Sequence, residues 1–264
     1  MIWKNITNSL MALTVIMVLM GWSRVETPSE QMLSYVRQFQ QIQVDIREYN
    51  ISPDSAARAF QATMRTIQSL TPLLDSCRDD DTTKFVFPLR GYLPKYSIGG
   101  NGRGFRAKGF DLFDADARGS HAAHDLFIRD GNQDNIDDRM CLPVDLLSFS
   151  QGIVVATDTT WQPDSQLRGG NFIWVYDPCL NGLFYYAHNS RVVVQPGQWV
   201  QAGQKLGEVG RTGLNAYKER SPTHVHMMFL RLDSAYLPQP ENPLAWLREA
   251  EVIQWTGTPE RVEN

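Results

Sequence analysis

The sequence predicts a mainly β protein, a compact antiparallel sheet or sandwich that is preceded by a helical hairpin. Residues 29–74 contain two stretches whose apolar side chains recur at steps of three and four, which is the spacing of amphipathic helices. From residue 84 to residue 232, short β-rich runs alternate with turn residues, and this favours antiparallel strands over alternating strands and helices. A polar segment, residues 78–83, separates the two parts.

Composition sets the broad class of protein. The chain has 264 residues, 42% of them hydrophobic and 20% charged, which is typical of a globular protein with a real core and excludes a disordered one. The formal net charge is -4. A protein that binds nucleic acid by neutralising phosphates is usually basic, so we expect no nucleic-acid partner.

The N-terminal segment predicts export. Lys4 precedes an apolar run, residues 10–20, that only Thr14 interrupts; a positive flank and a short apolar stretch are typical of a secretory signal or signal anchor. The run is shorter than the ~20 residues that span a bilayer, and a buried helix is the alternative. We expect residues 1–24 to be a signal peptide or signal anchor, and the protein to be periplasmic or anchored in the inner membrane facing the periplasm.

The helical hairpin is expected over residues 28–76. The first helix carries an apolar stripe on residues 29–49 and ends near Asn50. The second begins at Ser52 and Pro53, because serine is a preferred N-cap and proline suits the first helical position. A stalk or packing element, an arm that binds a protein partner, and an inhibitory cover over the site all remain open for this hairpin.

The β domain is expected over residues 84–250, with a polar tail at 251–264. Glycine-rich residues 96–106 indicate a long loop, and residues 242–251 indicate a closing helix. The expected strands are residues 84–87, 152–156, 172–176, 183–187, 191–194 and 225–232.

Three cysteines, Cys77, Cys141 and Cys179, are widely spaced. Without a Cys-x-x-Cys pair they do not predict a thiolate zinc site. In an oxidising compartment two of them can pair and leave one free, and the alternative is three small buried residues.

All five histidines fall within three short segments of the β-rich part. On an extended strand, residues two or four apart share a face, so His121 and Asp125 should point the same way, with His124 pointing away. The other histidines are His188, His224 and His226.

This grouping suits a catalytic zinc, which takes three protein ligands and leaves a fourth position for water. His121 and Asp125 with either His224 or His226 would supply two nitrogens and one oxygen. The remaining histidines would lie close to a water that zinc makes acidic, where imidazole is a suitable proton shuttle. Spacing alone leaves the choice of ligands open.

The order His-x-x-x-Asp, Tyr-x-His and His-x-His resembles the LytM/lysostaphin family of zinc metallopeptidases, peptidase family M23. Residues 152–156 are similar to the family's strand after the first motif, and residues 194–213 to its turn-and-strand signature. The resemblance extends over about residues 119–230.

The resemblance implies one zinc per chain, with His121, Asp125 and His226 as ligands and with His188 and His224 as the unligated catalytic histidines. It also implies a lysostaphin-like β domain of the duplicated-hybrid-motif type and the hydrolysis of peptide cross-links in peptidoglycan. The expected partners are therefore a peptidoglycan peptide and, through the N-terminal segment, the inner membrane.

The sequence departs from the family pattern in two places. Ala123 occupies a position where the family usually has glycine, and a positive φ there would be strained. Residues 130–149 are an insertion, and residues 130–138 resemble a calcium loop only in part, because the glycine and the final glutamate are missing. A solvated acidic loop is the alternative.

Other residues near the motifs lie outside the ligand pattern. We expect a structural or groove-rim role for His124, and either a contact with a substrate carboxylate or a solvated charge for Arg118. The aromatic residues Trp174, Tyr185 and Tyr186 are expected in the core.

Two other functions remain. One is a non-catalytic relative that binds cell wall or activates an amidase, although such relatives usually lose metal ligands and this chain keeps all of them. The other is an exported metallopeptidase that acts on proteins. The acidic composition and the export signal favour a Gram-negative envelope, and by analogy a cross-link that involves diaminopimelate rather than a glycine bridge.

Overall fold

The N-terminal part of the fold is a helical hairpin, as predicted. The computed structural model describes residues 26–71 and 85–255, so the expected signal segment, residues 72–84 and the last nine residues lie outside the described part. Within the described ranges, no helix is both long and apolar enough to cross a membrane.

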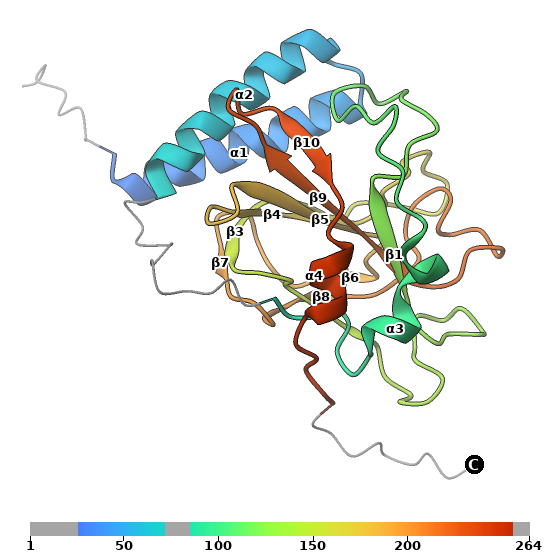
Figure 1. Cartoon of the computed structure of the whole chain (residues 1–264). Helices are drawn as coiled ribbons and strands as arrows, with labels where there is room; N and C mark the ends of the chain where they lie inside the picture. Colours follow the sequence, from blue (N-terminus) through green and yellow to red (C-terminus); the bar gives the residue numbers. More distant parts are fainter. Residues whose placement is uncertain (1–25, 72–84, 256–264) are drawn as a thin grey trace, which may run out of the picture.

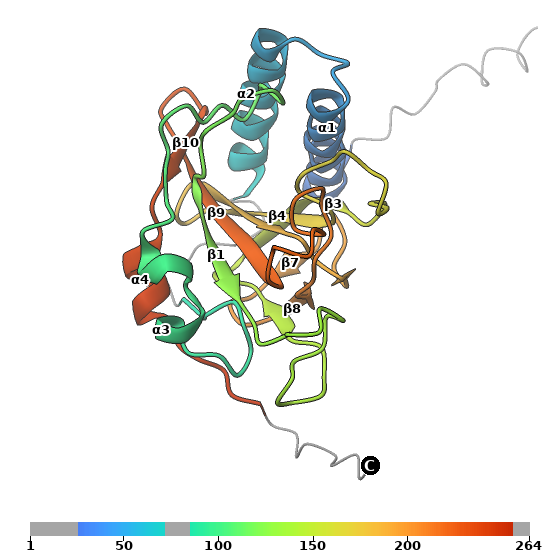
Figure 2. The ribbon, with the colours of Figure 1, turned by 90° about the vertical axis from the view of Figure 1, so that its right-hand side faces the viewer.

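The two helices begin where their capping residues lie. Helix α1 (Pro28–Arg47) starts with a capping box, in which Thr27 Oγ1 accepts from the Glu30 N–H and the Glu30 carboxylate accepts from the Thr27 N–H. Helix α2 (Pro53–Leu70) starts at Ser52, whose side chain accepts from the Ser55 N–H. The two helices lie side by side on one face of the sheet (Figures 1 and 2).

The large sheet has seven strands, all antiparallel, so the mainly β class is confirmed. Strand β9 is central to the site, because β5 pairs along one edge of it while β1 and β10 pair along the other. The path across the sheet is β1 (Ala123–Phe127), β9 (His224–Leu232), β5 (Gly182–Ala187), β4 (Phe172–Asp177), β3 (Gly152–Asp158) and β7 (Trp199–Val200), with β10 (Pro238–Glu241) also on β9.

A smaller sheet covers the other face of the large one. Its strands are β2 (Asp145–Leu147), β8 (Lys205–Glu208) and β6 (Arg191–Val192). Together with helix α4 (Leu244–Glu249), this sheet encloses a second hydrophobic core. The core includes Val154, Val175, Phe184, Leu206, Phe229 and Leu247.

Two local predictions were wrong. The segment expected as a loop over residues 96–106 contains a short helix α3 (Pro94–Ser97) and a 3₁₀ turn η3 (Gly99–Gly102). The strand expected at residues 84–87 is reduced, in its described part, to an isolated bridge between Val86 and Glu251. Runs as short as these give little periodicity from which to predict an element.

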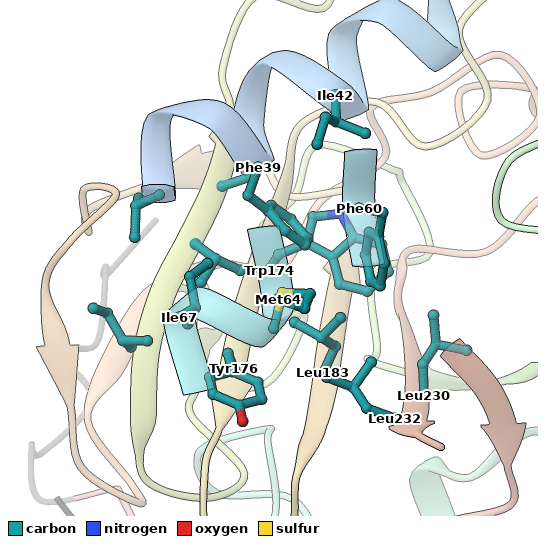
Figure 3. Close-up of a cluster of buried hydrophobic side chains, with 14 of the residues drawn as sticks. Phe39, Ile42, Phe60, Met64, Ile67, Trp174, Tyr176, Leu183, Leu230 and Leu232 are labelled. Carbon is teal, nitrogen blue, oxygen red and sulfur yellow. The ribbon is translucent and has the colours of Figure 1, made fainter. Parts of the chain in front are cut away.

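The hairpin is part of the core rather than an appendage. Phe39 of α1 and Phe60 of α2 are fully buried, and the Phe39 ring packs edge-on against Trp174 of β4, with ring centroids 6.2 Å apart. Figure 3 shows these rings with Leu183 and Leu230 of the sheet. A packing element is therefore the interpretation that the contacts favour.

The hairpin and the histidines share one face of the large sheet. Side chains alternate along a strand, and on β9 Met228 and Leu230 belong to the cluster under the hairpin, whereas Met227 and Phe229 lie in the other core. His226 lies two residues before Met228 on β9, so its side chain points to the same face, at the end where the pocket lies. The hairpin thus covers one half of this face and leaves the other half free.

The cysteines are not three equivalent buried thiols. Cys179 is disulfide-bonded, whereas Cys141 is free and exposed. Cys77 lies outside the described residues.

Candidate metal centre and active site

His121 and Asp125 point the same way, as their spacing predicts. His121 is held just before β1 by a two-bond bridge to Arg106, with N···O distances of 2.7 and 2.8 Å. Asp125 follows within the strand, and its Oδ1 lies 3.3 Å from His121 Nε2. The strand alternation therefore brings this nitrogen and this oxygen together.

His226 joins them from the neighbouring strand. Asp125 and His226 are directly opposite partners in the antiparallel pairing of β1 with β9. Side chains of such a pair are close enough to interact, and Asp125 Oδ1 lies 3.0 Å from His226 Nδ1. Of the two ligand choices that spacing left open, the one with His226 has the shorter contact, because His224 Nε2 is 3.8 Å from the same oxygen.

The arrangement fits a zinc site. His121, Asp125 and His226 each offer one ligand atom, and these three atoms lie within 4.8 Å of one another. Among the residues that the structure describes, these three form the group whose spacing suits a metal ion. Two ligand atoms that each lie about 2.0–2.1 Å from a tetrahedral zinc are roughly 3.3 Å from one another. The contacts at 3.3 and 3.0 Å are close to that value.

His188 and His224 lie beside this group. His188 follows the end of β5, and its ring centroid is 4.8 Å from that of His224 and 5.8 Å from that of His226. The backbone of His188 has φ +72°, a left-handed conformation that is uncommon for a residue with a side chain and that clusters at functional sites. The structure thus brings all five predicted site residues into one place.

Backbone carbonyls fix the tautomers of three of these histidines. The Nδ1 atoms of His121, His188 and His224 lie 3.0, 2.8 and 2.7 Å from the carbonyl oxygens of Gly104, Thr212 and Pro222. A carbonyl oxygen only accepts, so each Nδ1 carries the proton and donates it. In the neutral form of each ring, Nε2 is then the atom with the free lone pair, which is the state needed for a metal ligand or a base.

The charges of the site are set by burial and by Asp125. The hydrogen bond with Asp125 raises the pKa of His121. Burial lowers the pKa of His188 and of His224, so both rings are held neutral. Burial alone would raise the pKa of Asp125, but the hydrogen bonds with His121 and His226 outweigh it and hold that pKa well below its usual range.

The histidines open into a pocket of about 680 Å³, within the usual size range of ligand sites. Its walls come from β1, β5 and β9 and from three loops around residues 110, 168 and 215–222. No residue of α1 or α2 lines it, within the part of the chain that the structure describes. The position of the hairpin therefore does not support an inhibitory cover.

Ala123, His124 and Arg118 lie near the motifs, and each has a different environment. Ala123 lies within β1 and is absent from the residues with positive φ, so the missing glycine causes no strain. His124 is buried and does not line the pocket; its Nε2 lies 2.8 Å from Asn242 Oδ1, which agrees with a structural role. Arg118 pairs with Asp116 at 3.1 Å and also stays outside the pocket.

Two of the three aromatic residues lie in the core as expected. Trp174 packs under the hairpin, and Tyr186 OH accepts from the Phe149 N–H inside the other core. Tyr185 differs, because it lines the pocket and its ring centroid is 6.3 Å from that of His226.

The acidic insertion organises its own loop. Asp130 accepts from the N–H groups of Asp134 and Asn135 at 3.0 and 2.9 Å and from Thr223 Oγ1 at 2.6 Å. Asp137 accepts from the N–H groups of Arg139 and Met140. These carboxylates satisfy backbone donors, which is how a loop without calcium would use them.

The pocket also has residues that the sequence did not indicate. Arg168 and Arg220 line it from two loops, together with Phe110 and Asn215. Each stands in a polar segment with no periodicity, so its place in the pocket follows from the fold. Gly169 and Gly170, which follow Arg168, indicate a turn. They do not indicate that the turn places the Arg168 side chain at the pocket.

Residues 143–238 match the model of peptidase family M23. This range contains His188, His224 and His226 and begins after His121 and Asp125. This part of the chain is therefore similar to family M23, and the resemblance inferred from the motifs is confirmed.

The chain is also similar to several solved structures. One is the catalytic domain of the antimicrobial peptidase lysostaphin from Staphylococcus simulans, with 24% identity, 59% of this chain and 95% of that chain covered, and a TM-score of 0.39. Another is a putative glycyl-glycine endopeptidase LytM from Ruminococcus gnavus, with 20% identity, 86% and 89% covered, and a TM-score of 0.43. A third is a zinc-containing peptidase from Vibrio cholerae, with 18% identity, 64% and 40% covered, and a TM-score of 0.34. No curated protein matches the sequence.

Proposed function

We propose that the protein is a zinc-dependent endopeptidase that hydrolyses peptide cross-links of peptidoglycan. The observation that carries the proposal is the convergence of His121, Asp125 and His226 on one point, with the rings of His188 and His224 beside it. The match of residues 143–238 to the model of peptidase family M23 supports the same reaction class.

The ligands would be His121 through Nε2, Asp125 through Oδ1 and His226 through Nδ1, the atoms that already face one another. Zinc in such a site polarises a carbonyl group and increases the acidity of water. Two nitrogens and one carboxylate oxygen are a usual ligand set for catalytic zinc.

His188 and His224 would perform the proton transfers. With Nδ1 donating to a backbone carbonyl, each ring presents Nε2 as the basic atom. One Nε2 can take a proton from the attacking water and return it to the leaving amine, while the Nε2 of the other ring can accept a hydrogen bond from that water and orient it. Burial keeps both rings neutral before the reaction, which is the form a base needs.

We also propose that the protein is exported and works in the periplasm, either free or held at the inner membrane. The apolar run at residues 10–20 supports this. The disulfide at Cys179 supports it too, because disulfides persist in oxidising compartments.

The test combines metal content with cleavage. Purified protein should contain about one zinc per chain and release muropeptides from cross-linked peptidoglycan. His226→Ala should lose the metal and the activity, whereas His188→Ala should keep the metal and lose activity by at least about a hundredfold. His124→Gln is the matched control, because this histidine lies on the other face of β1, and it should keep both.

The competing functions predict other results. Zinc binding without cleavage of any peptide would favour a protein that binds cell wall or activates an amidase. Cleavage of unfolded proteins with intact peptidoglycan left uncut would favour an exported protease.

A further inference from the structure

The pocket is lined by more positive charge than the composition suggests. The chain has a formal net charge of -4, yet two arginines, Arg168 and Arg220, line the pocket. Asp125 is the one carboxylate among the described lining residues. A divalent metal on Asp125 would more than offset that charge, so anything that enters the pocket meets a positive wall.

Both arginines stand at the end of the pocket where His188 and His224 lie. Arg168 precedes Gly169, whose carbonyl accepts from the His188 N–H at 3.1 Å. Arg220 stands two residues before Pro222, whose carbonyl accepts from His224 Nδ1 at 2.7 Å. The Leu214 N–H donates to the Leu167 carbonyl at 2.9 Å and ties the two loops together.

The loop that carries Arg220, residues 214–222, is held from inside. Arg211 is only 6% exposed and donates to the carbonyls of Ser221 and, at 3.0 Å, of Lys218. From the acidic insertion, Gln133 Nε2 donates to the Glu219 carbonyl at 2.7 Å. The backbone beneath Arg220 is therefore fixed on both sides, and such preorganisation lowers the entropic cost of binding.

The guanidinium groups of the two arginines form few contacts with the described residues. Arg220 is exposed and forms no hydrogen bond or ion pair with any residue that the structure describes. Arg168 is exposed and has one contact, 3.5 Å from Nη1 to the Ala117 carbonyl. By contrast, Arg118 outside the pocket is paired with Asp116.

We propose that Arg168 and Arg220 form a carboxylate-recognition site, so that the preferred substrate is a peptide with a free carboxylate close to the bond that is cut, on the side of His188 and His224. The inference rests on the proposed peptidase function and names its substrate class. Guanidinium groups bind carboxylates through paired, charge-assisted hydrogen bonds, and this pocket offers two such groups and no competing anion at that end.

The test uses one cross-linked muropeptide dimer in two forms, with its free carboxylates intact or converted to carboxamides. The wild-type protein should cleave the carboxylate form with a kcat/KM about tenfold or more higher, mainly through KM, because a hydrogen bond to a charged group contributes about 1.5–3 kcal/mol. Arg220→Gln and Arg168→Gln should each reduce this preference, because kcat/KM should fall further for the carboxylate form than for the carboxamide form.

Lys218→Gln is the matched control. It removes the same charge from the same loop, its side chain does not line the pocket, and glutamine can still donate to Asn215 Oδ1 as Lys218 does. This variant should keep the wild-type preference. Equal cleavage of both forms by the wild type, or equal loss of both forms in the arginine variants, would overturn the proposal.

Failure of the proposed peptidase function would give a different result from failure of the recognition site. If the zinc-loaded wild type cleaves neither form, the binding of both forms is measured by calorimetry. Tighter binding of the carboxylate form that disappears in Arg220→Gln would still support the recognition site, and equal binding would overturn it.

Discussion

Two carboxylates of the large sheet, Asp125 and Asp177, have pKa values shifted in opposite directions. The hydrogen bonds with His121 and His226 hold the pKa of Asp125 down against the effect of burial. Asp177 is fully buried and accepts from neutral groups, among them the N–H groups of Cys179 and Leu180, so burial raises its pKa. The presence or absence of a nearby partner that can carry positive charge therefore decides whether the pKa of a buried carboxylate is lowered or raised.

Asp177 yields a prediction about stability and pH. Its pKa is higher in the folded state, so its contribution to stability is present below the unfolded pKa of about 4 and is lost as the pH rises through the folded pKa. Asp177→Asn keeps an oxygen that can accept from both N–H groups and removes the buried charge. We expect a higher thermal unfolding temperature than wild type at neutral pH, with the gain shrinking toward about pH 4.

Thermal unfolding followed by circular dichroism at the two pH values measures this difference. Asp177→Ala is the control, because it also removes the acceptor and should be destabilised at both. An Asn variant less stable than wild type at neutral pH would contradict the prediction.

At the scale of single residues, the sequence predicted which side chains meet, but not how they are held. Strand alternation placed His121 with Asp125, and the family motifs selected His226 over His224. The carbonyls that fix the imidazole tautomers belong to Gly104, Thr212 and Pro222. Two of these lie in loops distant in sequence from the ring they fix, so no local pattern indicates the contact.

At the scale of elements, hydrophobic periodicity predicted well where a segment buries a regular face. Both helices and strands β3, β4, β5 and β9 were expected within a few residues of their observed bounds. Strand β10 was missed because two of its four residues are prolines, which argue against a strand except at an edge, and β10 pairs with β9 only.

The hairpin yields a prediction about cooperativity. Phe60 of α2 is fully buried, with ring centroids 5.6 Å from Phe39 and 5.4 Å from Phe113. Phe60→Ala should lower the free energy of unfolding of the whole domain by about 3–5 kcal/mol, because the hairpin shares the core with the sheet. Urea denaturation followed by both tryptophan fluorescence and circular dichroism measures this.

Leu33→Ala is the control for that change, because Leu33 lies on α1 and is 37% exposed. Its effect should stay within about 1 kcal/mol. If Phe60→Ala instead produced a separate early transition and left the main one in place, the hairpin would be an independent unit.

For the molecule as a whole, the disulfide at Cys179 should add to stability. Such a bond typically contributes about 2–4 kcal/mol, so reducing agent should lower the unfolding midpoint of the wild type. Cys179→Ser should unfold at the same midpoint with and without reductant. Cys141→Ser, which changes the free and exposed cysteine, should retain the response to reductant, and loss of that response would contradict the assignment.

The shared face of β9 has a consequence for how the arrangement of the histidines forms during folding. A slip of one residue in β9 would turn His224 and His226 away from the pocket and, in the same step, turn Met228 and Leu230 away from the hairpin. Docking of the hairpin therefore penalises every misregistered pairing of this strand. The register that aligns the histidines is selected by apolar contacts several residues away, so the site should be assembled before any metal arrives.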